Sequence, residues 1–203
     1  MMNKDDKLTF IHIGKCGGST ISTTLKNNQI NFDEVHVRSF EFQPDKKYLI
    51  TIRNPVERFV SAFYWRKYLA SDQQKNRFGG EYEFFQKFAT IEDLIDDDIS
   101  ILQKQYVHHI KEDIHFYLGD FVNQCDPANI KGIICTENLN KDFERIFNIK
   151  IQGYEKKNSK RKKSLKEKDF RFLKKYLEKD YLVIEKLNNL KLLTTEQYKI
   201  LSR

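Results

Sequence analysis

The sequence predicts an α/β fold with a mostly parallel central sheet flanked by helices. Short apolar runs typical of buried strands alternate with longer segments that have helical periodicity, and this alternation favours a parallel sheet. Two of the predicted strands are followed at once by polar residues suited to an anion, which is where open α/β sheets bind ligands. The length of 203 residues fits one domain, so we expect a single domain over residues 1–203.

Each predicted strand is a short run rich in β-branched or aromatic residues, and the four runs lie near residues 8–13, 33–37, 48–52 and 131–136. Helices are predicted near residues 19–27, 55–70, 91–96, 100–110, 138–146, 165–178 and 180–190. Residues 71–83 have the composition of a loop, and we expect an insertion to begin there. Residues 153–164 are basic and lack apolar periodicity, which predicts a mobile loop.

Composition excludes several classes of protein. Residues 1–9 are polar and charged, and no apolar run approaches the length of a membrane span, so we expect a cytoplasmic protein with no membrane span. The three cysteines lack metal-site or disulfide spacing, which predicts reduced thiols. A net charge of +7 suits an anionic ligand. Because no nucleic-acid-binding motif accompanies this charge, nucleic acid is not an expected partner.

The first anion-binding motif is FIHIGKCGGST at residues 10–20. A buried strand is expected to end at Ile13, followed by a glycine turn and then a helix that opens at Ser19 and Thr20. The free N–H groups and the dipole at a helix N-terminus attract an anion, and Lys15 adds a full positive charge. The lysine precedes the glycines, whereas the P-loop of nucleotide triphosphatases has GxxxxGK followed by Ser or Thr. A kinase or GTPase is therefore less favoured.

The second motif is YLITIRNPVERFVSAFYW at residues 48–65. Asn54 is a good helix N-cap with Pro at the next position, and Glu57 stands where a capping box has its acid. Arg53 then lies at the end of a strand and Ser61 about two turns into the helix, a pair suited to a phosphate monoester. Arg58 is expected at the surface or in an ion pair, from its phase in the helix.

With both motifs in this order, the chain resembles the sulfotransferases that use 3′-phosphoadenosine 5′-phosphosulfate (PAPS), particularly the branch that includes heparan sulfate 2-O-sulfotransferase. The resemblance continues through IKGIICTENLNKDFERIF at residues 131–147 and the basic region from 156 to 187, so it covers most of the chain. It implies a P-loop-like sulfotransferase fold, PAPS as the cofactor and adenosine 3′,5′-bisphosphate as the product. Cys16 departs from the family pattern, in which a threonine is common.

The resemblance also implies which residues bind the cofactor. The 5′-phosphosulfate would be held by Lys15, Cys16, Gly17, Gly18, Ser19 and Thr20. The 3′-phosphate would be held by Arg53 and Ser61. A basic loop would close over the cofactor, with Ser159, Lys160 and Arg161 as candidates for phosphate contact. These motifs require no metal.

Sulfuryl transfer needs positive charge at the leaving phosphate and a base for the acceptor proton. Lys15, between a buried strand and two glycines, is expected to stabilise the leaving group. His36 is the leading candidate for the base, because members of the 2-O-sulfotransferase branch carry a catalytic histidine between the two motifs. A strand histidine with a satisfied hydrogen bond is an equal alternative for His36. The other candidate bases are His108, His109, Glu41 and Glu57.

Three further features have simple structural explanations. His12 alternates with Phe10 on the first strand and is expected in the core. The aromatic residues around Trp65 are expected to pack in the core instead of binding adenine. Glu137 or Asn138 is expected to cap the helix that follows.

The sequence as a whole predicts an enzyme that transfers a sulfuryl group from PAPS to an acceptor hydroxyl. The acceptor is expected to be a glycan, by analogy with the family, and a small molecule is the alternative. Two other functions remain open. One is a P-loop-type nucleotide kinase or NTPase, and the other is a non-catalytic basic protein that binds a polyanion.

Overall fold

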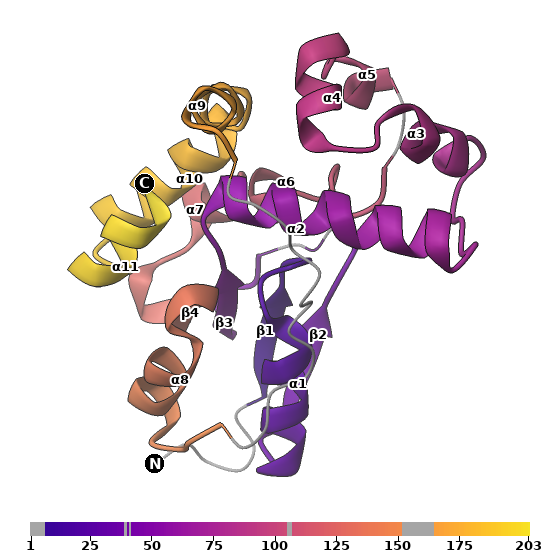
Figure 1. The fold of residues 1–203 in the computed structure, drawn as a ribbon. Helices are drawn as coiled ribbons and strands as arrows, with labels where there is room; N and C mark the ends of the chain where they lie inside the picture. The colour runs from indigo at the N-terminus through magenta and orange to yellow at the C-terminus, as the bar shows by residue number, and fades with distance from the viewer. Residues whose placement is uncertain (1–6, 39, 41, 105–106, 152–164) are drawn as a thin grey trace.

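The fold is drawn in Figure 1 from a computed structural model, which describes residues 7–38, 40, 42–104, 107–151 and 165–203. The predicted basic loop at 153–164 lies outside these residues, and with it the candidate contacts Ser159, Lys160 and Arg161. Glu41, one of the candidate bases, also lies outside them.

The centre of the protein is a four-stranded sheet in which every pair of neighbouring strands is parallel. The order is β2 (Phe32–Val35), β1 (Leu8–His12), β3 (Lys47–Ile52) and β4 (Ile130–Cys135). The predicted α/β class is therefore confirmed, and each predicted strand is found within three residues of its expected ends. His12 lies opposite Thr51 in the register of β1 and β3, so both strands end at the same edge of the sheet.

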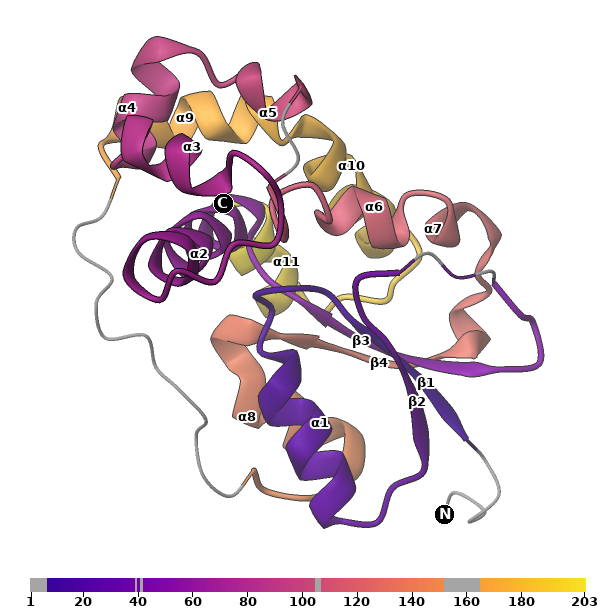
Figure 2. The ribbon, with the colours of Figure 1, turned by 90° about the vertical axis from the view of Figure 1, so that its right-hand side faces the viewer.

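Helices cover both faces of the sheet, as Figure 2 shows. One face carries α1 (Gly18–Asn27) and α8 (Leu139–Phe147). The other carries α6 (Ile114–Leu118), α7 (Phe121–Gln124), α10 (Glu178–Asn189) and α11 (Thr195–Leu201). Neighbouring side chains of β1 enter different clusters, Phe10 with α1 and α8 and Ile11 with the other face. This alternation explains why β1 is apolar throughout.

A third hydrophobic cluster surrounds α2 (Pro55–Lys67), which lies across the carboxyl edge of the sheet (Figure 1). The chain leaves α2 through a π-helical turn, η1 (Tyr68–Asp72). The cluster is completed by α3 (Glu81–Lys87), α4 (Ile91–Asp97), α5 (Ile101–Lys104) and α9 (Glu167–Tyr176). Short 3-10 turns, η2 (Pro127–Asn129) and η3 (Thr136–Asn138), flank β4.

A buried ion pair joins α2 to α3. Arg66 donates from Nε and Nη2 to the two carboxylate oxygens of Glu81 at 2.8 and 2.6 Å, and both side chains are at most 1% exposed. Glu81 also accepts a hydrogen bond from the main-chain N–H of Arg77 at 2.9 Å. The loop expected at residues 71–83 is therefore shorter and covers residues 73–80, because η1 includes residues 71 and 72 and α3 begins at the buried Glu81.

The sequence did not predict α3, α6, α7 or α11, each of which has seven residues or fewer. One or two turns give only a weak apolar period, and of the helices this short, α4 could be predicted because Ile91, Leu94 and Ile95 have helical spacing. The predicted end of the helix at residue 110 is wrong. Residues 108–110 form turns, and His109 has a φ of 64°. The final segment packs back onto the domain, with Leu187, Leu193 and Leu201 buried.

Asp180 is a buried carboxyl group in α10. One of its oxygens accepts a hydrogen bond from the main-chain N–H of His115 at 2.8 Å, and Oδ2 is buried without a hydrogen-bond partner among the described residues. Burial, followed by the charge of Asp113, raises the pKa of Asp180 to about 7. The folded protein therefore holds a proton that an unfolded chain releases near pH 4.

We expect this group to make the protein less stable as the pH rises from about 4 to about 7. In this window the unfolded chain binds fewer protons than the folded protein, and above it the two states no longer differ at this group. Asp180→Asn should remove this part of the slope, which urea denaturation between pH 5 and 8 can measure. Glu185→Gln, at an exposed position of the same helix, is the control. A slope that survives unchanged in Asp180→Asn would belong to another group.

Candidate functional site

The glycine turn after β1 forms one side of the candidate site. Lys15 and Gly17 both have positive φ, 70° and 76°, and for a lysine this is a strained conformation. Gly17 is the N-cap of α1 and makes no side-chain cap hydrogen bond. A Cβ on Gly18 would lie 1.8 Å from Cδ2 of His12, so only glycine fits. The turn thus leaves the N-terminus of α1 without a side-chain cap, an arrangement that suits an anion.

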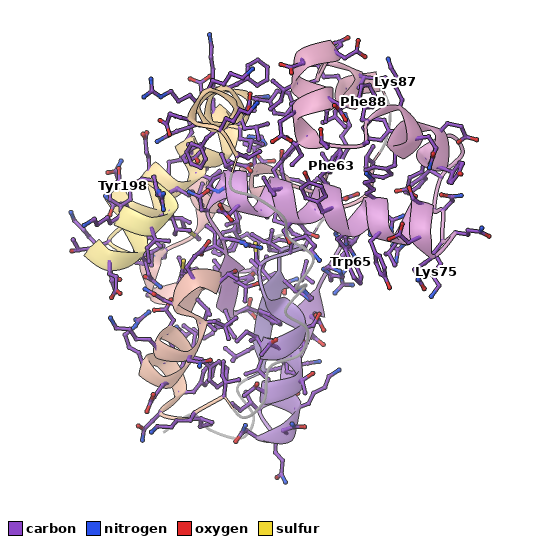
Figure 3. All side chains as sticks on the ribbon, in the orientation of Figure 1. Phe63, Trp65, Lys75, Lys87, Phe88 and Tyr198 are labelled. Carbon is purple, nitrogen blue, oxygen red and sulfur yellow. The ribbon has the colours of Figure 1, made fainter. Side chains whose placement is uncertain are left out.

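Lys15 extends from this turn towards α2. Its Nζ lies 4.4 Å from the centre of the Trp65 ring, a cation–π contact. Burial, and then the charge of Arg53, lower the pKa of Lys15 to about 8. Figure 3 shows Trp65 on the side of α2 that faces the sheet, whereas Phe63 is on the opposite side. Trp65, which the sequence predicts only as a packing residue, therefore also contacts the amine of Lys15.

Arg53 follows the last residue of β3 and reaches the same turn. Its Nη1 donates to the carbonyl oxygen of Lys15 at 3.5 Å. Its other contacts are long ion pairs, 3.6 Å to Glu57 and 3.7 Å to Glu137. Nε is buried and has no hydrogen-bond partner among the described residues. A guanidinium with weak contacts and an unused donor can take up a phosphate without losing strong bonds.

Ser61 lies between these two cations along α2. Glu57, Ser61 and Trp65 are spaced by four residues and share one face of the helix. Glu57 contacts Arg53 at one end of this face, and Trp65 contacts Lys15 at the other. The structure thus brings the two predicted anion-binding motifs together at the carboxyl edge of β1 and β3.

The remaining residues of the first motif differ in accessibility. Ser19 is exposed, Gly17 is partly exposed, and Thr20 is buried. Cys16 is fully buried in the hydrophobic cluster, its N–H donates to the carbonyl of Ile13 at 3.2 Å, and burial raises the pKa of its thiol to about 12. A buried neutral thiol is out of reach of a ligand, so nothing supports a cofactor contact by this side chain.

Histidines gather beside the glycine turn. His36 stacks on His12 with ring centres 4.1 Å apart, and its centre is 5.5 Å from that of His109. The sequence predicts His36 within the second strand, but β2 ends at Val35 and His36 follows it. Its Nδ1 is 2.8 Å from the carbonyl oxygen of His12. Because a carbonyl only accepts, Nδ1 carries the proton and neutral His36 has its acceptor at Nε2.

His12 is buried, as expected, and is anchored by a carboxylate. Its Nδ1 lies 2.5 Å from Oε1 of Glu34, which also accepts from the hydroxyl of Ser22 at 2.9 Å. Burial, followed by the nearby His36, lowers the pKa of His12 to about 4. Burial alone would raise the pKa of Glu34, but hydrogen bonds from His12 and Ser22 bring it below its usual value. At neutral pH the pair is therefore a neutral imidazole and a carboxylate.

His108 and His109, the other candidate bases, are nearly fully buried. Burial, with Arg77 next in effect, lowers the pKa of His108 to about 4. Burial, with His108 next, lowers that of His109 to about 2. Both are therefore weak bases. Together with Glu112 they place three potential metal ligand atoms within 4.8 Å of one another.

Other contacts already engage that cluster. Arg77 lies 2.8 Å from Nε2 of His108, and the main-chain N–H of His109 donates to Oε2 of Glu112 at 2.6 Å. The guanidinium charge of Arg77 beside His108 would repel a cation, so the cluster does not favour a metal site. The expectation that the site needs no metal remains a prediction.

Arg58 is buried, and the prediction that it lies at the surface is wrong. Its Nη1 donates to the carbonyl oxygens of His109, Glu112 and Gly14 at 2.8, 3.2 and 3.4 Å. The helix phase is misleading here because the 109–112 segment covers a face of α2 that would otherwise meet solvent. Arg58 thereby ties the glycine turn to the segment that carries His109.

Two predicted helix caps have different outcomes. Asn54 caps α2 as predicted, accepting from the N–H of Glu57 at 3.2 Å. The prediction for α8 is wrong, because its N-cap Asn138 makes no side-chain cap hydrogen bond. Glu137 instead lies beside Arg53 and accepts from the thiol of Cys135 at 3.0 Å.

Comparison with known proteins gives no identification: no known protein family, no curated protein and no solved structure matches the chain. Among the described residues, none of the helices is both long enough and apolar enough to cross a membrane.

Proposed function

We propose that the protein is a PAPS-dependent sulfotransferase with a P-loop-like sulfotransferase fold. One observation carries the proposal: Lys15 and Arg53 lie at opposite ends of the α2 face that bears Ser61, beside the glycine turn. PAPS has phosphate at both its 3′ and 5′ positions, and the site offers two cationic groups. The four-stranded parallel sheet, with the glycine turn directly after its β1 strand, agrees with this fold.

The residues fit the two ends of this ligand. Nε of Arg53 is buried and has no hydrogen-bond partner among the described residues, and with Ser61 this side chain would hold the 3′-phosphate. The uncapped N-terminus of α1, with Gly17, Gly18, Ser19 and Thr20, would hold the 5′-phosphosulfate. PAPS supplies the sulfuryl group, and its S–O bond to the 5′-phosphate breaks as the acceptor oxygen bonds to sulfur. Lys15 would stabilise the charge that remains on the phosphate.

His36 would act as the base. Its Nδ1–H is held by the carbonyl of His12, so Nε2 is the atom that would receive the proton of the acceptor hydroxyl. The low pKa values of His108 and His109 disfavour them for this role. Glu57 is also less suited, because it lies beside Arg53 at the other end of the site. A glycan hydroxyl is the acceptor that the family resemblance favours, with a small-molecule hydroxyl as the alternative.

Calorimetric titration with adenosine 3′,5′-bisphosphate tests this proposal. We expect the bisphosphate to bind more tightly than AMP, which lacks the 3′-phosphate. Arg53→Ala should weaken bisphosphate binding about 100-fold, which corresponds to about 2.7 kcal/mol and the loss of charged hydrogen bonds. Arg171→Ala, which removes an arginine exposed on α9, should leave binding unchanged.

Two other results would contradict the proposal. Equal binding of ATP with Mg²⁺ and of the bisphosphate, with no effect of Arg53→Ala, would favour a nucleotide kinase. Salt-sensitive binding to polyanions that survives Arg53→Ala, without bisphosphate binding, would favour a basic binding protein.

A further inference from the structure

We infer that Glu34 is a positioning residue for His36 and acts through His12. The inference rests on the proposed function, because it concerns the base of that reaction. The three side chains come from two neighbouring strands and the residue that follows β2. In the register of β1 and β2, Phe10 is paired with Glu34 and Ile11 with Val35, so the next residues, His12 and His36, leave the sheet side by side.

The first step of the argument is that Glu34 fixes the ring of His12. The carboxylate takes the Nδ1–H of His12 at 2.5 Å and is itself held by the Ser22 hydroxyl at 2.9 Å. A carboxylate that accepts at Nδ1 selects both the tautomer and the rotation of an imidazole. The His12 ring also lies where a Cβ on Gly18 would be, which leaves it little room to rotate.

The second step is that His12 fixes the ring of His36 in two ways. Its carbonyl oxygen accepts from Nδ1 of His36 at 2.8 Å, and its ring stacks on that of His36 at 4.1 Å with 20° between the planes. A rotated His12 would remove the surface on which His36 rests. The orientation of Nε2 of His36 therefore depends on the carboxylate of Glu34.

The third step concerns charge. When Nε2 takes the acceptor proton, Nδ1–H stays on the His12 carbonyl and the ring becomes a cation. His12 and His109 beside it are neutral, with pKa values of about 4 and about 2, and Lys15 on the glycine turn is positive. On β2, Glu34 is an ionised carboxylate close enough to affect the ring electrostatically. Arg38 donates to the main-chain carbonyl oxygen of Glu34 and not to its carboxylate. Glu34 thus supplies negative charge that favours the protonated base.

The test is a comparison of wild type with Glu34→Gln, which keeps the shape and removes the charge. Histidine NMR of the free protein should show His36 protonated at Nδ1 when neutral. An amide can donate or accept at Nδ1 of His12, so in Glu34→Gln we expect His12 to populate both neutral tautomers and the His36 ring signals to change as the ring loses its single orientation. Asp33→Asn is the matched control, because it removes an exposed carboxylate one residue away on the same strand.

Kinetics give a second readout in the same variants. We expect kcat to fall about twofold, because the base is no longer held in one orientation beside a negative charge. The KM for PAPS should not change. Asp33→Asn, whose carboxylate faces the exposed Lys7 and not the histidines, should behave as wild type.

The failures of the two ideas are distinguishable. A folded Glu34→Gln protein in which the His12 tautomer and the His36 ring signals are unchanged would overturn this inference, whether or not the enzyme is active. If wild type transfers no sulfuryl group and does not bind the bisphosphate, the proposed function fails even when the change in the histidine NMR signals is found.

Discussion

Glu81→Gln is expected to lower the free energy of unfolding by about 3 kcal/mol or more, because it leaves the charge of Arg66 buried without a counter-ion. Both side chains are almost completely buried, and their two hydrogen bonds are short. The substitution also disturbs the acceptor for the main-chain N–H of Arg77, so the loop before α3 should loosen together with the pair. Urea denaturation monitored by circular dichroism measures the change.

The matched control is an exposed pair of the same chemistry. Arg171 and Glu167 are four residues apart on α9, with side chains 77% and 74% exposed. Glu167→Gln should change the free energy of unfolding by about 0.5 kcal/mol or less, because solvent screens exposed pairs. Equal effects of the two substitutions would show that the pair of Arg66 and Glu81 does not stabilise the fold.

The sheet could be predicted from sequence because its strands are short apolar runs covered on both faces. Once β1 and β3 are recognised as parallel neighbours, their following residues must meet at one edge, and this places Lys15 near Arg53. Ser61 follows from the helical repeat of α2. These parts of the site depend on local sequence and on one strand pairing.

Other parts of the site depend on contacts between distant segments, which no local pattern encodes. The stack of His36 on His12 needs the chain to turn directly after β2, and His109 joins them only because the segment before α6 returns to the glycine turn. The burial of Arg58 could not be predicted for the same reason, because two of the carbonyl groups it binds lie about 50 residues further along the chain. The role of Glu34 could have been predicted from one feature of the sequence. Glu34 is a charged residue in a predicted strand, and the neighbouring predicted strand contains His12.

Lys15→Met is expected to reduce kcat about 100- to 1,000-fold if the protein is a sulfotransferase, because it removes the positive charge at the leaving phosphate. The change should affect stability little. Methionine keeps a long unbranched chain at a position where the lysine already has a φ of 70°, and the lost contact with Trp65 contributes about 1 kcal/mol or less. Lys26→Met, at an exposed position in the last turn of α1, should retain full activity.

The pH dependence of the same residue separates a catalytic charge from a merely structural side chain. Burial and the neighbouring Arg53 lower the pKa of Lys15 to about 8, so the free enzyme carries this charge at pH 7 and loses it as the pH rises above 8. We therefore expect kcat/KM to fall on the alkaline side with a midpoint near pH 8. A guanidinium stays charged throughout this range, so Lys15→Arg should retain part of the activity and lose the alkaline limb. If the limb persists in Lys15→Arg, another group titrates there and the charge of Lys15 does not set the rate.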